Sequence, residues 1–254
     1  TRRKPSSSRE RKLDMRFIAD LHIHSRHARA VSSRMVLPEL DRWADDKGIL
    51  VMGTGDFTHP AWYEHLTKNL IPAEQGLYRL RAEHQLSTLK GTKANTRFML
   101  TTEIACMYTR AGKGRRIHVL LFAPDLEAVK KINEALTAKK CNIKSDGRPI
   151  VGLDVVEVLK IALAADQRCV MVPAHVWTPW FGLLGSKSGF NSLEECFGEY
   201  AKHIFAVETG LSSDPLMNWR LSAFDHLALL SNSDSHSLER IGREANIFDT
   251  ELSY

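Results

Sequence analysis

Two histidines one residue apart are the first sign of chemistry in this sequence. His22 and His24 follow a short apolar run, Phe17-Ile18-Ala19, which predicts that a buried strand ends at this point. Side chains two positions apart on a strand point the same way, so both imidazoles face one spot. Neutral imidazole is a good ligand for zinc, manganese or iron. The pair therefore predicts one corner of a metal site, provided that other parts of the chain supply further ligands.

Further residues of metal-binding type stand beside other short apolar runs. The set comprises Asp56, His59, Glu103, His118, His175, Asp234 and His236. Most of them follow a run, whereas His118 lies near the start of one. Together with the first pair they suit a site of two or three divalent ions, in which Glu103 bridges the ions and Glu103, Asp56 and Asp234 take part in catalysis. Zn²⁺ or Mn²⁺ suits so many imidazoles better than Mg²⁺, which is a third option.

The other histidines and one early aspartate have different expected roles. Four histidines are expected to be structural because they lie in helical or loop sequence: His65, His84, His203 and His226. His27 follows the first pair closely enough to reach the site. Asp20 precedes that pair, and we expect it to orient a histidine through the ring N–H rather than to bind metal.

Short apolar runs alternate with helical segments along most of the chain. Strands are expected at residues 15–19, 49–52, 98–100, 117–122, 169–172, 204–207, 227–230 and 245–248. Helices are expected at residues 37–47, 61–90, 126–138 and 154–165, with a short one from 214. This alternation is typical of a parallel α/β barrel, in which the carboxyl ends of the strands converge on one face. The sequence thus predicts an α/β fold that brings distant residues into one cluster.

The composition is that of a globular protein with one large domain. The chain has 254 residues, of which 43% are hydrophobic and 26% charged. No apolar run approaches the roughly 20 residues that span a bilayer, so no membrane association is expected. The four cysteines are far apart, which favours reduced thiols in a cytoplasmic protein over disulfides or a zinc ribbon. Nothing resembles a serine or cysteine triad or a dinucleotide-binding loop.

The positive charge is concentrated at the start of the chain. Residues 1–14 hold six Arg or Lys and two acidic residues, whereas the other 240 residues hold 29 basic and 28 acidic side chains. We expect residues 1–14 to be a disordered basic tail, which either helps to bind a polyanion or is an unselected extension. Binding of nucleic acid by the rest of the chain would have to come from local clusters.

Three loops supply such clusters. Candidate phosphate-binding residues are Arg115 and Arg116 in an expected flexible loop at 109–116, Lys144 and Arg148 in a basic loop at 139–152, and Lys187 in a Gly/Ser-rich loop. Trp177 and Trp180 directly follow His175. These aromatic rings either stack on an extruded base or fold inward as a hydrophobic plug.

The same residues resemble the motifs of a known superfamily. The run DLHIHS at 20–25, together with Asp56, Glu103, His118, His175 and the DSH at 234–236, resembles the PHP (polymerase and histidinol phosphatase) superfamily. That resemblance implies a distorted (β/α)7 barrel with a trinuclear metal site and phosphoesterase activity. Longer motifs at 53–60, 144–149, 175–181, 185–190, 231–236 and 240–244 resemble the endonuclease Q group of this superfamily. That group nicks DNA on the 5′ side of deaminated bases (hypoxanthine, uracil, xanthine) and abasic sites during DNA repair.

The sequence departs from the superfamily pattern at two places. Many members have a third histidine soon after the first pair, where this chain has Ala30, and Asp56 is not adjacent to its histidine. Asp56 with His59 nearby is therefore expected to replace the missing ligand. The group also carries a zinc-binding and helical module after the barrel. We expect this chain to consist of the tail and a catalytic barrel at 15–254, without that module, so its affinity for damaged DNA is expected to be weak or lost.

Two other functions fit the same ligand set less well. A small-molecule phosphomonoesterase, such as a histidinol-phosphate or nucleotide phosphatase, would use the same metal chemistry but does not require the Trp-rich and basic loops. A metal-binding barrel with only a structural role in a larger repair protein would not require the full set of ligands.

Overall fold

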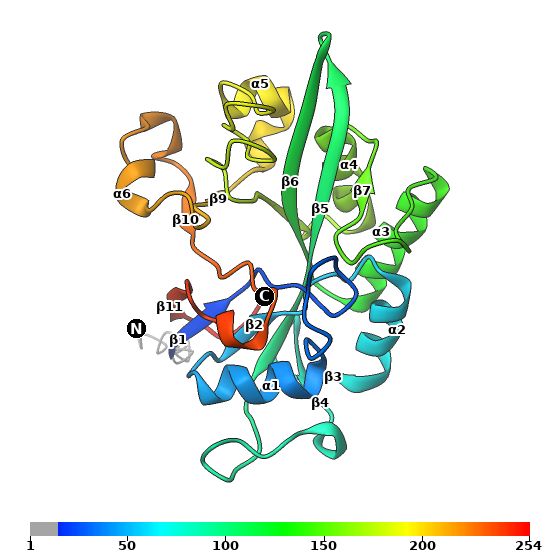
Figure 1. Cartoon of the computed structure of the whole chain (residues 1–254), viewed down its shortest axis with the longest axis vertical. Helices are drawn as coiled ribbons and strands as arrows, with labels where there is room; N and C mark the ends of the chain where they lie inside the picture. Colours follow the sequence, from blue (N-terminus) through cyan, green and yellow to red (C-terminus); the bar gives the residue numbers. More distant parts are fainter. Residues whose placement is uncertain (1–14) are drawn as a thin grey trace, which may run out of the picture.

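The computed structural model describes residues 15–254, so the tail expected at 1–14 lies outside the described residues. The chain forms an α/β fold whose larger helices lie outside the strands (Figure 1). The strands are β1 Met15–Asp20, β2 Val51–Gly53, β3 Leu70–Pro72, β4 Leu77–Leu80, β5 Arg97–Arg110, β6 Lys113–Ala123, β7 Ile150–Val151, β8 Val170–Pro173, β9 Ala206–Glu208, β10 Ala228–Leu230 and β11 Asn246–Thr250. The α-helices are α1 Leu37–Asp46, α2 Pro60–Asn69, α3 Leu126–Ala138, α4 Val155–Ala165, α5 Leu193–Phe197 and α6 Pro215–Asn218. Short 3₁₀ turns are η1 Ala82–His84, η2 Gly198–His203, η3 Ser222–Phe224 and η4 Leu238–Arg240.

The strands divide into a nine-stranded sheet and a two-stranded sheet. One path through the large sheet runs β11-β1-β2-β5-β4-β3, and β6 joins β5 to β8. β9 and β10 pair only with each other among the described strands. The α/β class is confirmed. The closed (β/α)7 barrel is not confirmed, because no strand ladder joins β8 to β9 or β10 to β1 in the described residues.

The prediction of a flexible loop at 109–116 is wrong, because these residues belong to two paired strands. β5 and β6 form one long antiparallel hairpin in which Arg110 pairs with Lys113, and only Ala111 and Gly112 turn the chain, both with positive φ. The hairpin stands out from the rest of the fold (Figure 1). In this antiparallel pair His118 lies opposite Ala105, two residues beyond Glu103. Because β6 runs antiparallel to β5, His118 lies close to Glu103 although it comes early in its own strand.

The prediction of a single helix at 61–90 is also wrong. α2 ends at Asn69, and the chain continues through β3 and β4, which pair antiparallel with each other. Pro72 cannot donate a helical hydrogen bond, and Gly76 adopts a positive φ of 72°, so the chain turns between the strands. The apolar spacing that suggested one face of a helix instead places Leu77 and Leu80 in the core.

The helices expected at 126–138 and 154–165 are confirmed as α3 and α4. The Asp125 side chain accepts from the backbone N–H of Ala128, and Asp154 accepts from that of Val156, so both helices begin at capping carboxylates. Their apolar stripes join the main core with that of α1. A second apolar cluster, which includes Phe17, is formed mainly by strand side chains.

The described helices contain no candidate for crossing a membrane. None between residues 15 and 254 combines the necessary length with the necessary apolar character.

Candidate metal centre

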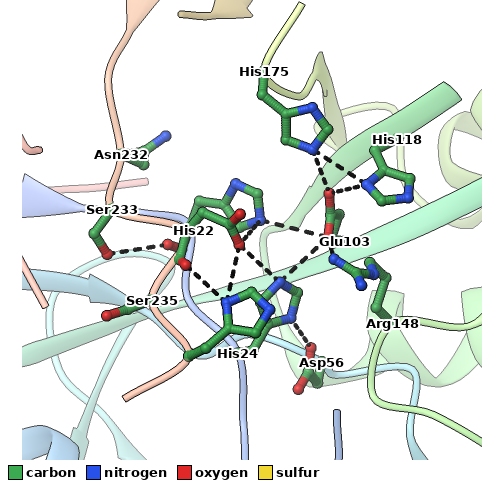
Figure 2. A network of polar contacts seen from close by, with 12 residues as sticks. His22, His24, Asp56, Glu103, His118, Arg148, His175, Asn232, Ser233 and Ser235 are labelled. Atoms are coloured by element: carbon green, nitrogen blue, oxygen red, sulfur yellow. Dashed lines mark hydrogen bonds and ion pairs between the residues drawn. The ribbon is translucent and has the colours of Figure 1, made fainter. Parts of the chain in front are cut away.

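Side chains from five parts of the chain meet at one end of the sheet (Figure 2). Their possible ligand atoms form two groups, each with all atoms within 4.8 Å of one another. The inner group comprises His22, His24, Asp234 and Glu103. The outer group comprises His118, His175 and Glu103. Glu103 is shared, so the arrangement can hold two cations on either side of one carboxylate.

Each oxygen of Glu103 faces one group. Oε1 lies 2.7 Å from His118 Nδ1 and 3.1 Å from His175 Nε2. Oε2 lies 3.3 Å from His24 Nε2 and 3.7 Å from His22 Nε2. The carboxylate is buried at the centre of both groups, so it would be a ligand to an ion in either group.

Partners on the far side fix three imidazole rings. His22 Nδ1 lies 3.0 Å from Glu208 Oε1, and His24 Nδ1 lies 3.0 Å from Asp56 Oδ1. His175 Nδ1 lies 2.8 Å from the hydroxyl of Thr178. Such contacts orient the Nε2 atom of each ring toward the centre and set its tautomer.

An unpartnered buried nitrogen in the inner group indicates that a metal ion fits there. His22 Nε2 is buried and has no hydrogen-bond partner, although it lies 3.5 Å from Asp234 Oδ1. Leaving such an atom without a partner is costly, and a cation shared with Asp234 and Glu103 would satisfy it. The donor set of imidazoles and carboxylates also matches that of divalent transition metals, so the residues present fit the group.

The charges in the two groups stabilise one another. Burial disfavours a charged imidazole, but Glu208 and Asp234 outweigh this at His22, and Asp56 does so at His24; the pKa of each ring is raised well above its ordinary value. Burial opposes ionisation of Glu103, yet His118 and His22 hold its pKa well below its ordinary value. A divalent ion that binds the inner group must therefore displace protons.

Asp56 and His59 do not take the places expected for them. Asp56 lies behind His24, and its Oδ2 also accepts from the backbone N–H of Ser25 at 2.6 Å and from the Ser25 hydroxyl at 2.7 Å. Both oxygens are thus used, and Asp56 lies outside both groups. His59 lies outside them as well; its ring stacks on that of His27, with 4.4 Å between centroids.

Two other predicted residues also differ from expectation. Asp20 does not orient a histidine: its carboxylate accepts from the backbone N–H of Ser233 and of Gly242, and so supports the loop that carries Asp234. The rings of His236 and His24 meet edge to face with 4.6 Å between centroids, and His236 Nδ1 lies 2.9 Å from the carbonyl oxygen of Asp234. It adjoins the inner group without belonging to it.

Three residues of the site have a strained backbone. Asp56, His175 and Asp234 all adopt positive φ, between 30° and 50°. This region is unfavourable for residues with a side chain, so the surrounding contacts must impose it. Position 147 needs a glycine, because a Cβ there would lie 2.4 Å from Asp56 Oδ2 and would clash with it. The close approach lets the following residue, Arg148, reach Glu103 Oε2 at 3.1 Å.

Glu208 is a site residue that the sequence reasoning missed. It is buried, accepts from His22 and from the side chain of Asn232 at 2.8 Å, and accepts from the backbone N–H of His175 at 2.9 Å. It connects the ends of β1, β8, β9 and the segment after β10. The available signal was its position: Glu208 ends the strand after β8 just as a carboxylate follows other strands.

A cavity of about 250 Å³ opens beside the two groups. Its lining includes His118, Arg148, His175, Trp180 and Asp234. Among the candidate substrate residues, Arg148 and Trp180 therefore border the site directly. Arg116 lies over the Trp180 ring at 4.9 Å, which presents a cation and an aromatic face together.

The remaining candidate substrate residues do not border this cavity. Arg115 donates to the carbonyl of Gly189 and lies over the Phe190 ring at 4.0 Å, so it supports a loop. Trp177 is partly buried and donates to Asn218 Oδ1 at 2.9 Å. Lys144 and Lys187 are exposed and do not line it.

Comparison with known proteins identifies relatives of this chain. No protein-family profile matches the sequence. An uncharacterised protein of Bacillus subtilis, YqxK, is 32% identical over 243 residues, which cover 91% of this chain and 58% of that protein. Among solved structures, the lesion-specific endonuclease Q of Pyrococcus furiosus is 33% identical with a TM-score of 0.76, covering 92% of this chain and 52% of that one.

A second endonuclease Q structure matches equally well. It is a complex with a 27-mer duplex that has an abasic lesion at the active site; identity is 33%, the TM-score is 0.76, and the match covers 92% of this chain and 53% of that chain. This chain thus spans about half the length of the endonuclease Q chains that it matches, and 58% of the length of YqxK.

Proposed function

We propose that this chain is the catalytic part of a metal-dependent DNA endonuclease, acting in repair on the phosphodiester 5′ to an abasic site or a deaminated base (hypoxanthine, uracil or xanthine). The observation that carries the proposal is the pair of ligand groups sharing Glu103 beside a cavity, in a chain similar to endonuclease Q. The abasic duplex at the active site of that relative supports damaged DNA as the substrate.

Two divalent ions suit the two groups, with Zn²⁺ or Mn²⁺ favoured by the imidazoles. The inner ion would be held by His22, His24 and Asp234, and the outer ion by His118 and His175, with Glu103 between them. Bound in this way, the ions supply an activated water and stabilise the charge that develops on the phosphate.

The chain's own residues position the strand to be cut. Arg148 contributes a guanidinium to the cavity and is held by Glu103, so it is placed to bind a phosphate oxygen. Trp180, with Arg116 over its ring, offers a face on which a base next to that phosphate can stack. Glu208 and Asp56 keep His22 and His24 aimed at the reacting centre.

The strand order also supports an open form of the barrel found in this superfamily. The order β1-β2-β5-β6-β8 follows strand pairing, and Val176 N–H donates to the Glu208 carbonyl at 3.0 Å across the β8–β9 joint. An isolated bridge between Ile23 and Ser235 spans the joint between β10 and β1. The four cysteines are free, which fits a reducing compartment, and we propose a cytoplasmic location.

A nicking assay tests the function directly. The chain is incubated with Mn²⁺ or Zn²⁺ and 5′-labelled duplexes that carry one abasic site, one uracil, one hypoxanthine or no lesion. We expect a single cut on the 5′ side of the lesion, none in the undamaged duplex, and none with the Glu103→Gln variant.

The outcomes separate the proposal from its alternatives. Equal cutting of all duplexes would remove lesion specificity. Rapid hydrolysis of an aryl phosphate without any nicking would assign the chain to the small-molecule phosphatases. Binding of fewer than two ions per chain, with neither activity, would favour a structural role.

A further inference from the structure

A buried asparagine lies on the side of His22 that faces away from Glu103 (Figure 2). The amide Nδ2 of this residue, Asn232, donates to Glu208 Oε1 at 2.8 Å. Its Oδ1 accepts from the backbone N–H of Leu21 at 3.0 Å. Neither contact involves an atom of the two ligand groups, so Asn232 is linked to His22 through the Glu208 carboxylate.

The backbone fixes which way round the Asn232 amide lies. A backbone N–H can only donate, so the Asn232 atom that faces the N–H of Leu21 must be the oxygen. Asn246 Nδ2 donates to the same oxygen at 2.9 Å, and Asn246 is itself oriented because its Oδ1 accepts from the backbone N–H of Ser231 at 2.9 Å. Two backbone donors therefore place the NH₂ group of Asn232 against Glu208.

Glu208 is consequently surrounded by donors. Asn232 donates to Oε1, and the backbone N–H of His175 donates to Oε2 at 2.9 Å. These two contacts favour the ionised carboxylate, which can only accept hydrogen bonds. The third neighbour, His22 Nδ1, lies 3.0 Å from Oε1 and must therefore carry a proton.

The position of this proton decides whether His22 can bind metal. With its proton on Nδ1, a neutral imidazole presents a lone pair at Nε2. Nε2 is the atom of His22 that is buried, has no hydrogen-bond partner and lies 3.7 Å from Glu103 Oε2. A proton on Nε2 would occupy that lone pair. The chain of hydrogen bonds that begins at the backbone of Leu21 thus leaves Nε2 as a free ligand atom.

Side-chain contacts matter here because the strands on either side do not pair. Among the described strands, β9 and β10 pair only with each other, so no ladder fixes Glu208 at the end of β9 against His22 after β1. Asn232 lies in the segment after β10 and contacts both ends, the backbone of Leu21 and the carboxylate of Glu208. Removing its side chain would remove a contact that joins them.

We propose that Asn232 is a positioning residue for the inner ion: by holding the Glu208 carboxylate as an acceptor, it keeps the His22 proton on Nδ1 and leaves Nε2 free to bind metal. This inference rests on the metal centre of the proposed function and adds to it a residue that touches no ligand atom. Asn246 lies one step further from Glu208, so it supports the fold without taking part in this orientation.

The same substitution at the two asparagines tests the proposal. Asn232→Leu removes the donor to Glu208, whereas Asn246→Leu removes amide hydrogen bonds one residue further away. We expect both variants to melt at a lower temperature, since each leaves a backbone N–H without its partner. In a titration with chelator-buffered Mn²⁺, Asn232→Leu should bind one ion about 10-fold more weakly, and Asn246→Leu should stay within about twofold of the parent. Equal losses in the two variants, or no loss in Asn232→Leu, would overturn the proposal.

An NMR measurement on the parent chain locates the proton independently of any variant. In the Zn²⁺-loaded chain labelled with ¹⁵N-histidine, the His22 proton should be bonded to Nδ1 and should exchange slowly with water, because Glu208 holds it. In Asn232→Leu the same proton should exchange faster, and in Asn246→Leu it should exchange as in the parent. A proton on His22 Nε2, or equal exchange in the parent and Asn232→Leu, would contradict the positioning role.

These readouts keep the positioning role separate from the endonuclease function, because neither depends on cleavage. A parent chain that binds two ions and shows the Nδ1 proton, but nicks no duplex, would contradict the endonuclease function and support the role of Asn232. A parent chain that nicks the abasic duplex with the proton on His22 Nε2 would contradict only the role of Asn232. Failure of the parent chain to bind any ion would overturn both.

Discussion

The two groups that share Glu103 are built differently. In the inner group, both imidazoles are fully buried and each is held from behind by a carboxylate, Glu208 or Asp56. In the outer group, both imidazoles line the cavity, and the His175 ring is held from behind by the hydroxyl of Thr178 instead of a carboxylate. A buried imidazole backed by a carboxylate is a more basic and better fixed ligand.

This difference suggests a division of work. The inner group is suited to hold an ion tightly, and the outer group to hold an ion that meets the substrate. The surrounding charges divide the groups less sharply: against the effect of burial, carboxylates raise the pKa of His22, of His24 and also of His175, whereas burial dominates at His118 and lowers its pKa.

Removing the shared carboxylate should weaken metal binding by both groups. Glu103→Gln keeps the shape but leaves each group with one neutral oxygen or amide nitrogen, so both ions should bind weakly and nicking should fall about a thousandfold or more. Metal analysis after gel filtration and the nicking assay measure both effects. Glu194→Gln, an exposed change on α5, is the control. Retention of two ions per chain by Glu103→Gln would contradict the bridging role.

Removing the inner group's support should weaken that group selectively. In Glu208→Gln, His22 Nδ1 loses its carboxylate partner, and we expect metal affinity to fall about 10- to 100-fold. Competition titration with chelator-buffered Mn²⁺ measures the affinity of each site. The inner site should weaken more than the outer one, which Glu208 contacts only through the backbone N–H of His175. Unchanged binding at both sites would show that Glu208 has only a packing role.

Protons should compete with metal at the inner group. Because the folded-state pKa of His22 and His24 is raised, their protonation stabilises the metal-free fold fully below the unfolded value of 6.5, and this stabilisation is lost as pH rises through the folded-state pKa values. The melting temperature of chelated protein should therefore decrease from this source as pH rises above 6.5. Adding Mn²⁺ should reverse the trend, since a deprotonated site binds metal better. Parallel pH trends with and without Mn²⁺ would argue against metal binding by these rings.

The smallest effect is expected in the outer group. Thr178→Val removes the hydroxyl that lies 2.8 Å from His175 Nδ1 and preserves the side-chain shape. The hydroxyl also donates to the His175 carbonyl at 2.9 Å, but only its hydrogen bond with Nδ1 orients the ring, so we expect about a threefold loss of affinity or of nicking rate. The same titration as for Glu208→Gln gives the comparison. A loss as large as that of Glu208→Gln would mean that the two groups are equally dependent on their supports.

Much of the fold follows from local sequence. Aspartate caps, and in α3 an apolar stripe, predict α3 at its observed bounds and α4 to within one residue, because both signals act within one or two helical turns. The segments at 61–90 and 109–116 were mispredicted for the opposite reason. Leu77 and Arg115 owe their structure to strand partners, and pairing between strands does not show in the periodicity of one segment.

The residues of the site were likewise predictable only as far as local sequence determines them. The sequence by itself determined which side chains could bind metal, because short apolar runs are local features and His22, His24, Glu103, His175 and Asp234 all follow such runs, although Glu103 lies within β5 in the structure. Only the tertiary structure decided which of the candidates share a centre. It placed Asp56 behind His24 and brought Glu208 to His22, because a contact between residues 186 positions apart depends on how strands assemble and not on what surrounds either residue in the chain.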